Sequence, residues 1–182
     1  DFSYNLGKTQ IAKFPVSPRD SALLMVLNRA ENTIEHKVFS DIVDYMNKGD
    51  VLVVNKTKVM QARLYGSKER TNAKIEVFVL RELNKEENIW DVIVDPARKV
   101  RIGNRIYFND NLWCEVIDNT TSRGRTVRFN NNSKDIFEAI EKIGLTPLPP
   151  YIKREAVPED KENYQTVFAQ VDGSVAAPTA GL

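Results

Sequence analysis

The sequence has very little cysteine and histidine and no long apolar run. Its 182 residues include one Cys and one His. A single cysteine excludes an internal disulfide, so nothing requires an oxidising compartment. No segment reaches the roughly 18 consecutive apolar residues that a membrane-spanning helix needs. With no basic and apolar leader apparent either, we expect a cytoplasmic protein without membrane contact.

Several nucleotide-binding and metal-binding motifs are also missing. The sequence contains neither a G-x-G-x-x-G fingerprint nor a Walker A loop, which argues against a Rossmann dinucleotide site or a P-loop. Only His36 and Cys114 offer an imidazole or a thiol, so a zinc site has no support and we expect no metal. We expect His36 to be an ordinary strand residue and Cys114 to pack as a small apolar side chain.

Charge is nearly balanced overall but not locally. The 26 Lys and Arg residues against 25 Asp and Glu give a net charge of +1, which excludes a uniformly basic nucleic-acid binder. Residues 50–74 nevertheless carry six basic against two acidic residues, and residues 96–128 carry seven against three. The middle of the chain is therefore basic.

The pattern divides the chain into three parts: 1–59, 60–131 and 132–182. In the first, short apolar runs at 22–28 and 34–39 predict two strands. A helix capped by Ser40 or Asp41 and ended by Gly49 follows. Residues 51–54, Val-Leu-Val-Val, do not alternate and predict a strand buried on both faces. These elements indicate an α/β layer.

The second part is rich in β-forming residues. Short runs are separated by Asn, Gly and Asp, the spacing typical of a small barrel or sandwich. About six strands are expected, over residues 63–66, 74–80, 89–94, 105–108, 113–117 and 125–129.

The third part begins with a predicted helix. Ser133 can cap it, Ile136 and Ile140 belong to its apolar stripe, and Gly144 ends it. Residues 147–150, Pro-Leu-Pro-Pro, form a stiff linker that is neither helix nor central strand.

Two basic turns could hold RNA phosphates. The turn 120–125 has two arginines flanking a glycine, and residues 95–101 form a second basic turn. Arginine offers bidentate donors to phosphate, although an ordinary solvated hairpin end explains the same pattern. The RNA-contact candidates are Arg98, Lys99, Arg101, Arg123 and Arg125.

Three further segments remain, and two of them permit both a ligand-binding and a structural interpretation. Asn55 to Lys58 follow the predicted buried strand, where they could contact a ligand or simply form a turn through Asn55 and Thr57. Arg19 and Asp20 could form a surface ion pair. The glycine- and alanine-rich residues 173–182 could approach a ligand closely or be a flexible end.

Ordered blocks along the whole chain resemble one enzyme family. They include Gly144-Leu-Thr-Pro-Leu-Pro-Pro-Tyr-Ile-Lys-Arg154, Tyr164-Gln-Thr-Val-Phe-Ala169 and Gly173-Ser-Val-Ala-Ala-Pro-Thr-Ala-Gly-Leu182. Upstream, the matching blocks include Arg19-Asp20, Asp50-Val-Leu-Val-Val-Asn55 and Asp95-Pro-Ala-Arg-Lys-Val-Arg-Ile-Gly103. The sequence is similar to the S-adenosylmethionine:tRNA ribosyltransferase-isomerases of queuosine biosynthesis.

The resemblance implies a fold and a reaction. The expected fold is mixed α+β: an α/β domain, incomplete here, interrupted by a small six-stranded antiparallel β-barrel. The expected enzyme transfers and isomerises the ribosyl group of S-adenosylmethionine, its cosubstrate, onto 7-aminomethyl-7-deazaguanine at the tRNA wobble position. Epoxyqueuosine forms while adenine and methionine leave. The sulfonium activates the neighbouring ribose carbon, and a cytoplasmic monomer is expected.

The resemblance also implies site residues. Asp20 would be a base or ribose acceptor, Arg19 and Arg154 would take part in the catalytic site, with Arg154 clamping a phosphate or carboxylate, and residues 173–181 would wall the adenosine. The implied substrate-binding residues are Asn55, Thr57, Arg63, Ser174, Pro178 and Thr179.

The sequence departs from the family at several positions. Ala22 and Leu23 stand where Ser and Arg are usual, Gln61 replaces Pro, and Phe168 replaces Tyr. In the family, chain of similar length follows the position of Leu182, so we expect a fragment that does not turn over alone. The alternatives are an RNA-binding β-barrel module and a divergent, non-catalytic paralogue.

Overall fold

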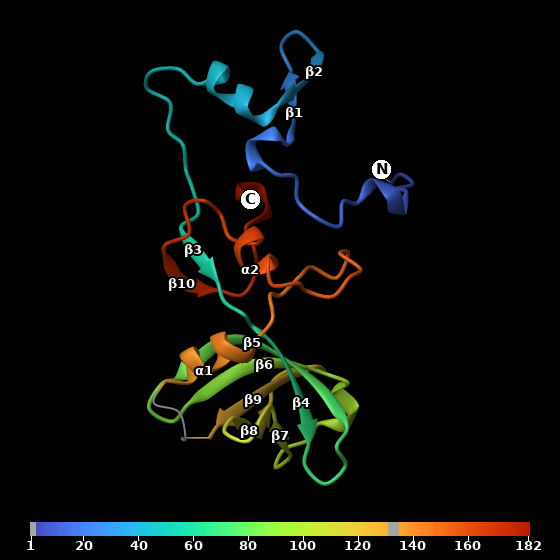
Figure 1. The fold of residues 1–182 in the computed structure, drawn as a ribbon, viewed down its shortest axis with the longest axis vertical. Coiled ribbons are helices and arrows are strands. Elements are labelled where there is room, and N and C mark those ends of the chain that lie inside the picture. The colour runs from blue at the N-terminus through green and yellow to red at the C-terminus, as the bar shows by residue number, and fades with distance from the viewer. Residues whose placement is uncertain (1–2, 131–134) are drawn as a thin grey trace.

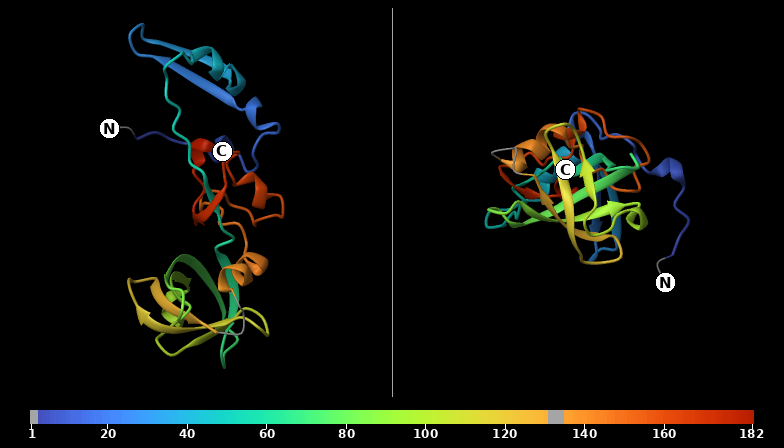
Figure 2. Two further views of the ribbon diagram at one scale, coloured as in Figure 1. Left: turned by 90° about the vertical axis from the view of Figure 1, so that its left-hand side faces the viewer. Right: turned by 90° about the horizontal axis from the view of Figure 1, so that it is seen from below.

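The computed structural model describes residues 3–130 and 135–182. The molecule is elongated (Figure 1): a β-barrel occupies one end, a β-hairpin the other, and a small central part lies between them. The side view on the left of Figure 2 shows the same three levels.

The barrel is closed and antiparallel, with strand order β4-β5-β6-β9-β8-β7. This confirms the six-stranded barrel predicted from the sequence. Closure pairs the outer strands, so the barrel leaves no open sheet edge. Its strands are β4 (Arg63–Lys68), β5 (Lys74–Asn84), β6 (Ile89–Asp95), β7 (Arg105–Tyr107), β8 (Trp113–Asn119) and β9 (Gly124–Phe129).

Alternation along the strands fills the barrel interior. Ile75, Val77 and Val79 of β5 are fully buried, as are Val92 and Val94 of β6. Successive side chains of a strand point to opposite faces, so these positions share the inward face. The barrel therefore has an apolar core of its own.

Helix α1 (Ile136–Ile143) packs on the barrel rather than on the central part (Figure 1). Ile136 and Ile140 are buried within the barrel core cluster. The carboxylate that caps the helix belongs to Asp135, which accepts hydrogen bonds from two backbone N–H groups of the first turn. Ser133, the expected cap, lies outside the described residues. Gly144 ends the helix as predicted, where an added Cβ would collide with the Gln61 carbonyl.

The central part is built from segments far apart in the sequence. β3 (Thr57–Val59) pairs in parallel with β10 (Val171–Ser174). Helix α2 (Asp160–Asn163) lies between them in sequence. Short 3₁₀ turns complete the chain: η1 (Lys8–Gln10), η2 (Arg19–Ser21), η4 (Ala97–Lys99) and η5 (Thr179–Gly181).

The N-terminal hairpin confirms the first two predicted strands. β1 (Leu23–Asn28) pairs antiparallel with β2 (Thr33–Val38). The helix expected next is a 3₁₀ segment, η3 (Phe39–Tyr45), in which the Asp41 carboxylate accepts a bond from the Val38 N–H at 3.1 Å. No membrane-length apolar helix occurs within the described residues.

The buried strand expected at residues 51–54 is wrong. The segment forms no strand, and its valines Val51 and Val53 are 85% and 88% exposed. Its apolar composition correctly records a preference for burial, but a strand forms only where a partner supplies hydrogen bonds. Among residues 3–130 and 135–182, none pairs with it, so the expected α/β layer is not formed there.

The barrel core predicts a contrast between two leucines on neighbouring strands. Leu64 is 1% exposed inside the barrel, whereas Leu83 near the end of β5 is 47% exposed. Leu64→Ala should lower the free energy of unfolding by about 2–5 kcal/mol because it leaves a cavity. Leu83→Ala should change it by less than about 0.5 kcal/mol in the same denaturant titration. Equal losses in the two variants would contradict the core described above.

Candidate functional site

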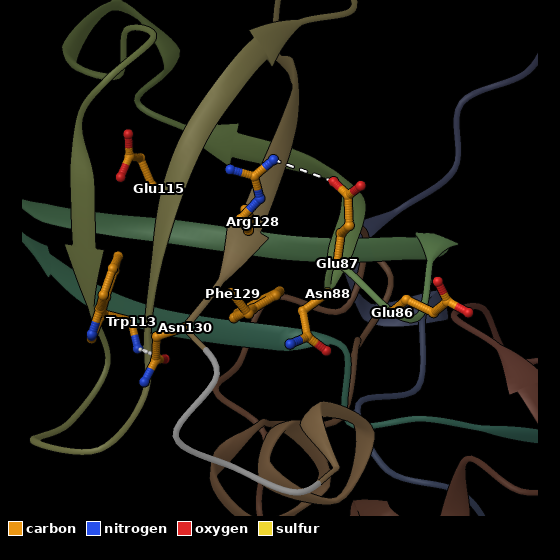
Figure 3. Close-up of a pocket in the computed structure, with 8 residues that line it drawn as sticks. All are labelled: Glu86, Glu87, Asn88, Trp113, Glu115, Arg128, Phe129 and Asn130. Carbon is orange, nitrogen blue, oxygen red and sulfur yellow. Dashed lines mark hydrogen bonds and ion pairs between the residues drawn. The ribbon is translucent and has the colours of Figure 1, made fainter.

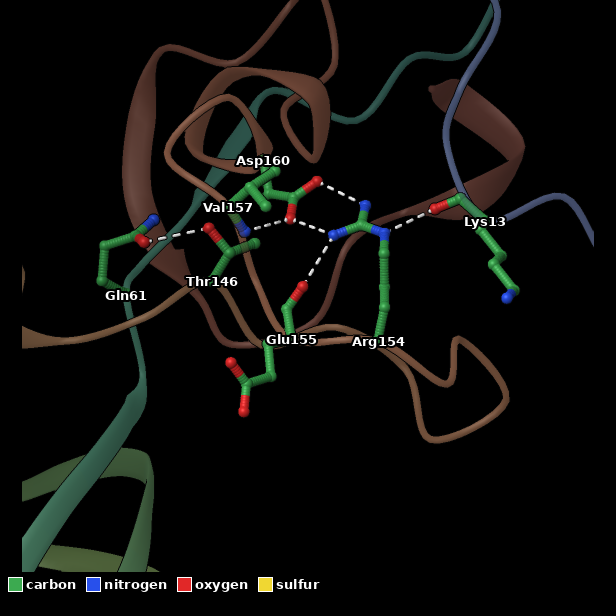
Figure 4. Close-up of polar contacts among 7 residues, drawn as sticks. All are labelled: Lys13, Gln61, Thr146, Arg154, Glu155, Val157 and Asp160. Atoms are coloured by element: carbon green, nitrogen blue, oxygen red, sulfur yellow. Dashed lines mark hydrogen bonds and ion pairs between the residues drawn. The ribbon is translucent and has the colours of Figure 1, made fainter.

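Arg154 joins three segments of the central part (Figure 4). Its guanidinium donates two hydrogen bonds to the Asp160 carboxylate, at 2.6 and 2.7 Å. Its Nε donates to the Lys13 carbonyl at 2.7 Å, and its Nη1 to the Glu155 carbonyl at 3.0 Å. The guanidinium also lies 4.1 Å from the centre of the Phe14 ring. Arg154 thus attaches the N-terminal segment to the start of α2.

This ion pair is shielded from solvent. The Asp160 side chain is fully buried and the Arg154 side chain is 11% exposed. Hydrogen bonding from Arg154 lowers the pKa of Asp160 below its ordinary value, although burial alone would raise it. The hydrogen bond from the Val157 N–H lowers this pKa further. The same hydrogen bond raises the pKa of Arg154. Arg154, expected to clamp a phosphate or carboxylate, here clamps a carboxylate of its own chain.

Arg19 makes a second attachment. Its Nη1 donates to the Gln165 carbonyl at 2.5 Å and its Nη2 to the Glu162 carbonyl at 2.7 Å. Both carbonyls lie at or just beyond the C-terminal end of α2, where a cation is favoured. Arg19 and Asp20 therefore do not form the surface ion pair that the sequence allowed. The exposed Asp20 carboxylate bonds to none of the residues that the structure describes.

A cavity of about 260 Å³ lies between these attachments. Arg19 lines it, and two of its five N–H donors are used elsewhere, so three remain. Ala22 contributes a methyl group to the cavity wall. Tyr164 also lines the cavity, and burial raises the pKa of its hydroxyl. The remaining lining residues are Ala12, Lys13, Phe14, Pro15, Val16, Asn163 and Leu182.

Asn55 and Thr57 form a turn at the start of β3. The Asn55 Oδ1 accepts bonds from the Thr57 N–H at 2.8 Å and from its hydroxyl at 2.6 Å. Of the two interpretations left open by the sequence, the turn is confirmed, because this is an Asx turn. The Thr166 hydroxyl donates to the Asn55 carbonyl at 3.1 Å, which ties the turn to the chain after α2.

The C-terminal candidates lie beside the same strand. The Ser174 carbonyl accepts a bond from the Met60 N–H at 2.8 Å, while its hydroxyl donates to the Ala176 carbonyl at 2.7 Å. Thr179 begins η5 and Pro178 directly precedes it, accepting a hydrogen bond from the Gly181 N–H through its carbonyl. The structure therefore gathers Arg19, Arg154, Asn55, Thr57 and Ser174 in the central part.

Sequence reasoning passed over Gln165, which contacts β3 through its side chain. Its Oε1 accepts from the Val59 N–H and its Nε2 donates to the Val59 carbonyl, both at 2.8 Å. Its only signal was its place in the Tyr164-Gln-Thr-Val-Phe-Ala169 block, because a glutamine specifies no chemistry by itself.

Arg63 lies apart from this group. It stands at the start of β4, where its Nε faces the Glu76 carboxylate at 3.4 Å and its Nη2 donates to the Leu148 carbonyl at 3.3 Å. Its guanidinium also lies 5.7 Å from the centre of the Phe78 ring. These contacts place Arg63 at the junction with the barrel.

Arg125 differs from the other RNA-contact candidates because it is buried, with 7% of its surface exposed. Its guanidinium donates to the carbonyls of Ala97, Val100, Thr121 and Gly124. It therefore braces the two basic turns against each other and faces the protein.

The remaining basic candidates are exposed on these adjoining turns. Arg98, Lys99 and Arg101 lie on the first turn, and Arg123 on the second. Arg123 is 3.4 Å from the Asp95 carboxylate, and its carbonyl accepts a bond from the Val94 N–H.

A larger hollow, about 490 Å³, lies on the barrel (Figure 3). It contains none of the predicted site residues, and its charges are mixed: Arg128 pairs with Glu87 at 3.4 Å, and Glu86 and Glu115 lie nearby. Trp113, Asn88, Phe129 and Asn130 complete the lining.

Neither His36 nor Cys114 lines the two cavities described above. His36 is exposed on β2, and Cys114 is fully buried in the barrel, where burial raises the pKa of its thiol. Both match their expected structural roles. In the part of the chain that the structure describes, no three His, Cys, Asp or Glu side chains gather as metal ligands do.

The family model and the curated proteins that match this chain all belong to queuosine biosynthesis or carry one enzyme name. The sequence model of a family described as "Queuosine biosynthesis protein" matches residues 1–182. The chain is 63% identical over its full length to the S-adenosylmethionine:tRNA ribosyltransferase-isomerase of Chloroherpeton thalassium, covering 53% of that protein. It is 57% identical to the protein of the same name from Flavobacterium psychrophilum, again covering 53%.

A solved structure is also similar in sequence. It is an S-adenosylmethionine tRNA ribosyltransferase from Thermotoga maritima, with 33% identity and a TM-score of 0.40 over 83% of this chain and 51% of that one. The chain spans about half the length of the curated relatives it matches.

The buried ion pair predicts a specific acid sensitivity. The lowered pKa of Asp160 means that its contribution to stability is complete above the ordinary pKa of about 4 and is lost as pH falls through the lowered folded-state value. Asp160→Asn should lower the free energy of unfolding by about 1–3 kcal/mol at pH 7, because a largely shielded guanidinium loses its counter-charge.

The free energy of unfolding of Asp160→Asn should also fall less steeply below pH 4 than that of the wild type. Denaturant titrations at a series of pH values measure this difference. Glu159→Gln changes the exposed neighbour and serves as the matched control. An unchanged acid profile in Asp160→Asn would contradict the ion pair.

Proposed function

The chain belongs to the family of queuosine biosynthesis proteins, and from this premise we propose that it takes part in modifying tRNA with S-adenosylmethionine. The proposed reaction transfers and isomerises the ribosyl group of S-adenosylmethionine onto 7-aminomethyl-7-deazaguanine at the wobble position. Epoxyqueuosine-tRNA forms, with release of adenine and methionine. A cytoplasmic monomer remains our expectation.

The observation that carries this proposal is the match along the whole chain. The family model covers residues 1–182, and the named relatives are 57% and 63% identical over that length. Those relatives carry the name S-adenosylmethionine:tRNA ribosyltransferase-isomerase. At such identity a shared reaction is the simplest explanation, although this chain covers only about half of each relative.

We assign the cosubstrate to the cavity beside Arg19. Three guanidinium N–H groups of Arg19 remain available for polar groups of a ligand, and the aromatic Phe14 and Tyr164 offer apolar surface. Asp20, exposed and without an internal partner among the described residues, is the proposed base or ribose acceptor beside it. Residues 173–181, which lead to Leu182 in the cavity lining, are the proposed wall for the adenosine, so Ser174, Pro178 and Thr179 stay among the substrate-binding candidates.

Arg154 has a different proposed part. Its guanidinium donates to acceptors of its own chain on Lys13, Glu155 and Asp160. We propose that it holds Lys13 and Phe14 in place as one side of the cavity. Its contribution is then preorganisation of the site, which lowers the cost of ordering the wall when a substrate binds.

The proposed reaction can be tested directly. The protein encoded by the complete reading frame that contains these residues is incubated with S-adenosylmethionine and tRNA bearing 7-aminomethyl-7-deazaguanine. Adenine and methionine should appear in equal amounts, together with a modified tRNA, and neither should appear with tRNA bearing guanine at that position. Release of S-adenosylhomocysteine instead would indicate methyl transfer and contradict the proposal.

We further propose that the adjoining basic turns of the barrel contact the tRNA backbone. The exposed side chains of Arg98, Arg101 and Arg123 are the contact candidates, with Lys99 beside them, and Arg125 acts from beneath by bracing the turns. Charge-based contacts of this kind bind without reading sequence.

The combined variant Arg98→Ala, Arg101→Ala and Arg123→Ala should weaken tRNA binding. It should also reduce the slope of log affinity against log salt by about one for each phosphate that an arginine no longer neutralises. The matched control replaces three exposed basic residues elsewhere, Arg29, Lys48 and Lys142, by alanine. Equal effects in the two triple variants would contradict a specific surface. Salt-dependent binding with no S-adenosylmethionine turnover by wild type would favour the RNA-binding module instead.

A further inference from the structure

We propose that Gln165 is a positioning residue, which sets Arg19 and strand β3 in the arrangement that the proposed reaction uses. The inference rests on the proposed function and adds to it a residue that does not itself line the cavity. Gln165 meets both elements: its backbone carbonyl accepts from Arg19 at 2.5 Å, and its side chain binds Val59 of β3.

The contact with Val59 imitates the pairing of two strands. The Gln165 carboxamide accepts from the Val59 N–H and donates to the Val59 carbonyl, each at 2.8 Å. Val59 is 3% exposed, so water does not readily replace these bonds. A backbone group left unpaired in such a place has lost its water without gaining a partner, which destabilises the folded arrangement. The carboxamide therefore fixes the end of β3 at a defined distance from the chain after α2.

The next residue fixes the other end of the same strand. The Thr166 hydroxyl donates to the carbonyl of Asn55, whose side chain holds Thr57. β3 also pairs with β10, where the Ser174 carbonyl accepts from the Met60 N–H. A movement of Gln165 would consequently shift Arg19 and the Asn55 to Val59 segment together.

The chemistry of the contact demands an amide. A carboxamide supplies one donor and one acceptor in the same plane without gaining or losing a proton, whereas a carboxylate supplies acceptors alone. In Gln165→Glu the carboxylate still accepts from the Val59 N–H but faces the Val59 carbonyl with a second acceptor. Gln165→Met keeps the length of the side chain and removes both bonds without adding charge.

The test measures kcat and KM for S-adenosylmethionine with the protein encoded by the complete reading frame. Because a misplacement of about 1 Å can cost on the order of 100-fold in rate, Gln165→Glu and Gln165→Met should lower kcat/KM by about 10- to 100-fold. Gln170→Glu is the matched control: Gln170 is exposed, and its contact within the described residues is made by its backbone N–H, which donates to the Lys56 carbonyl. It should retain wild-type kinetics.

A double-mutant cycle with Arg19→Ala separates positioning from simple loss of stability. If Gln165 acts through Arg19, Gln165→Met should cost several-fold less in the Arg19→Ala background than in wild type, because residues that act as a unit are not additive. An equal fold-loss in both backgrounds overturns the positioning role. So does a Gln165→Met variant as active as Gln170→Glu. A wild-type protein that releases no adenine or methionine rejects the proposed function itself, a result distinct from either.

Discussion

The buried ion pair between Arg154 and Asp160 is the interaction on which the central part of the molecule depends. Most of its surroundings are extended chain and short turns, which bury little apolar surface. The guanidinium meets four acceptors, including the Lys13 carbonyl 141 residues away in sequence. Breaking such a pair leaves a buried charge unpaired, whereas satisfying it fixes three segments at once. The ion pair also positions Lys13 and Phe14, which line the adjacent cavity.

The barrel and the central part are stabilised by different means. The barrel has a continuous apolar core and closed hydrogen bonding, and the braced turns beside Arg125 lie on its surface. The central part relies on polar contacts that link distant residues, chiefly through Arg19, Gln165 and Thr166. Local openings cost least where few apolar contacts are buried, so the cavity belongs to the more adaptable region.

Sequence reasoning succeeded where the signal was local. Short β-rich runs separated by turn residues predicted about six strands in a small barrel or sandwich, and the family resemblance implied the barrel, which the structure contains. The prediction of a buried strand at residues 51–54 was wrong, because an apolar segment favours burial but its sequence does not show which strand would pair with it. For the site, ordered motifs brought Arg19 and Arg154 to notice, but their acceptors are mostly backbone carbonyls, which every residue carries. Gln165 and the burial of Arg125 depend on tertiary contacts that no spacing encodes.

The central claim is that α2 and the residues flanking it hold β3 and the N-terminal segment as one unit. Hydrogen exchange of single amides under native conditions tests it most directly. The Val59 N–H bonds to the Gln165 side chain, the Met60 N–H to Ser174 and the Val157 N–H to Asp160. These three amides should open with one common free energy, lower than that of the barrel amide of Val77. Three unrelated opening free energies, with Val59 exchanging as freely as an exposed loop amide, would contradict the account.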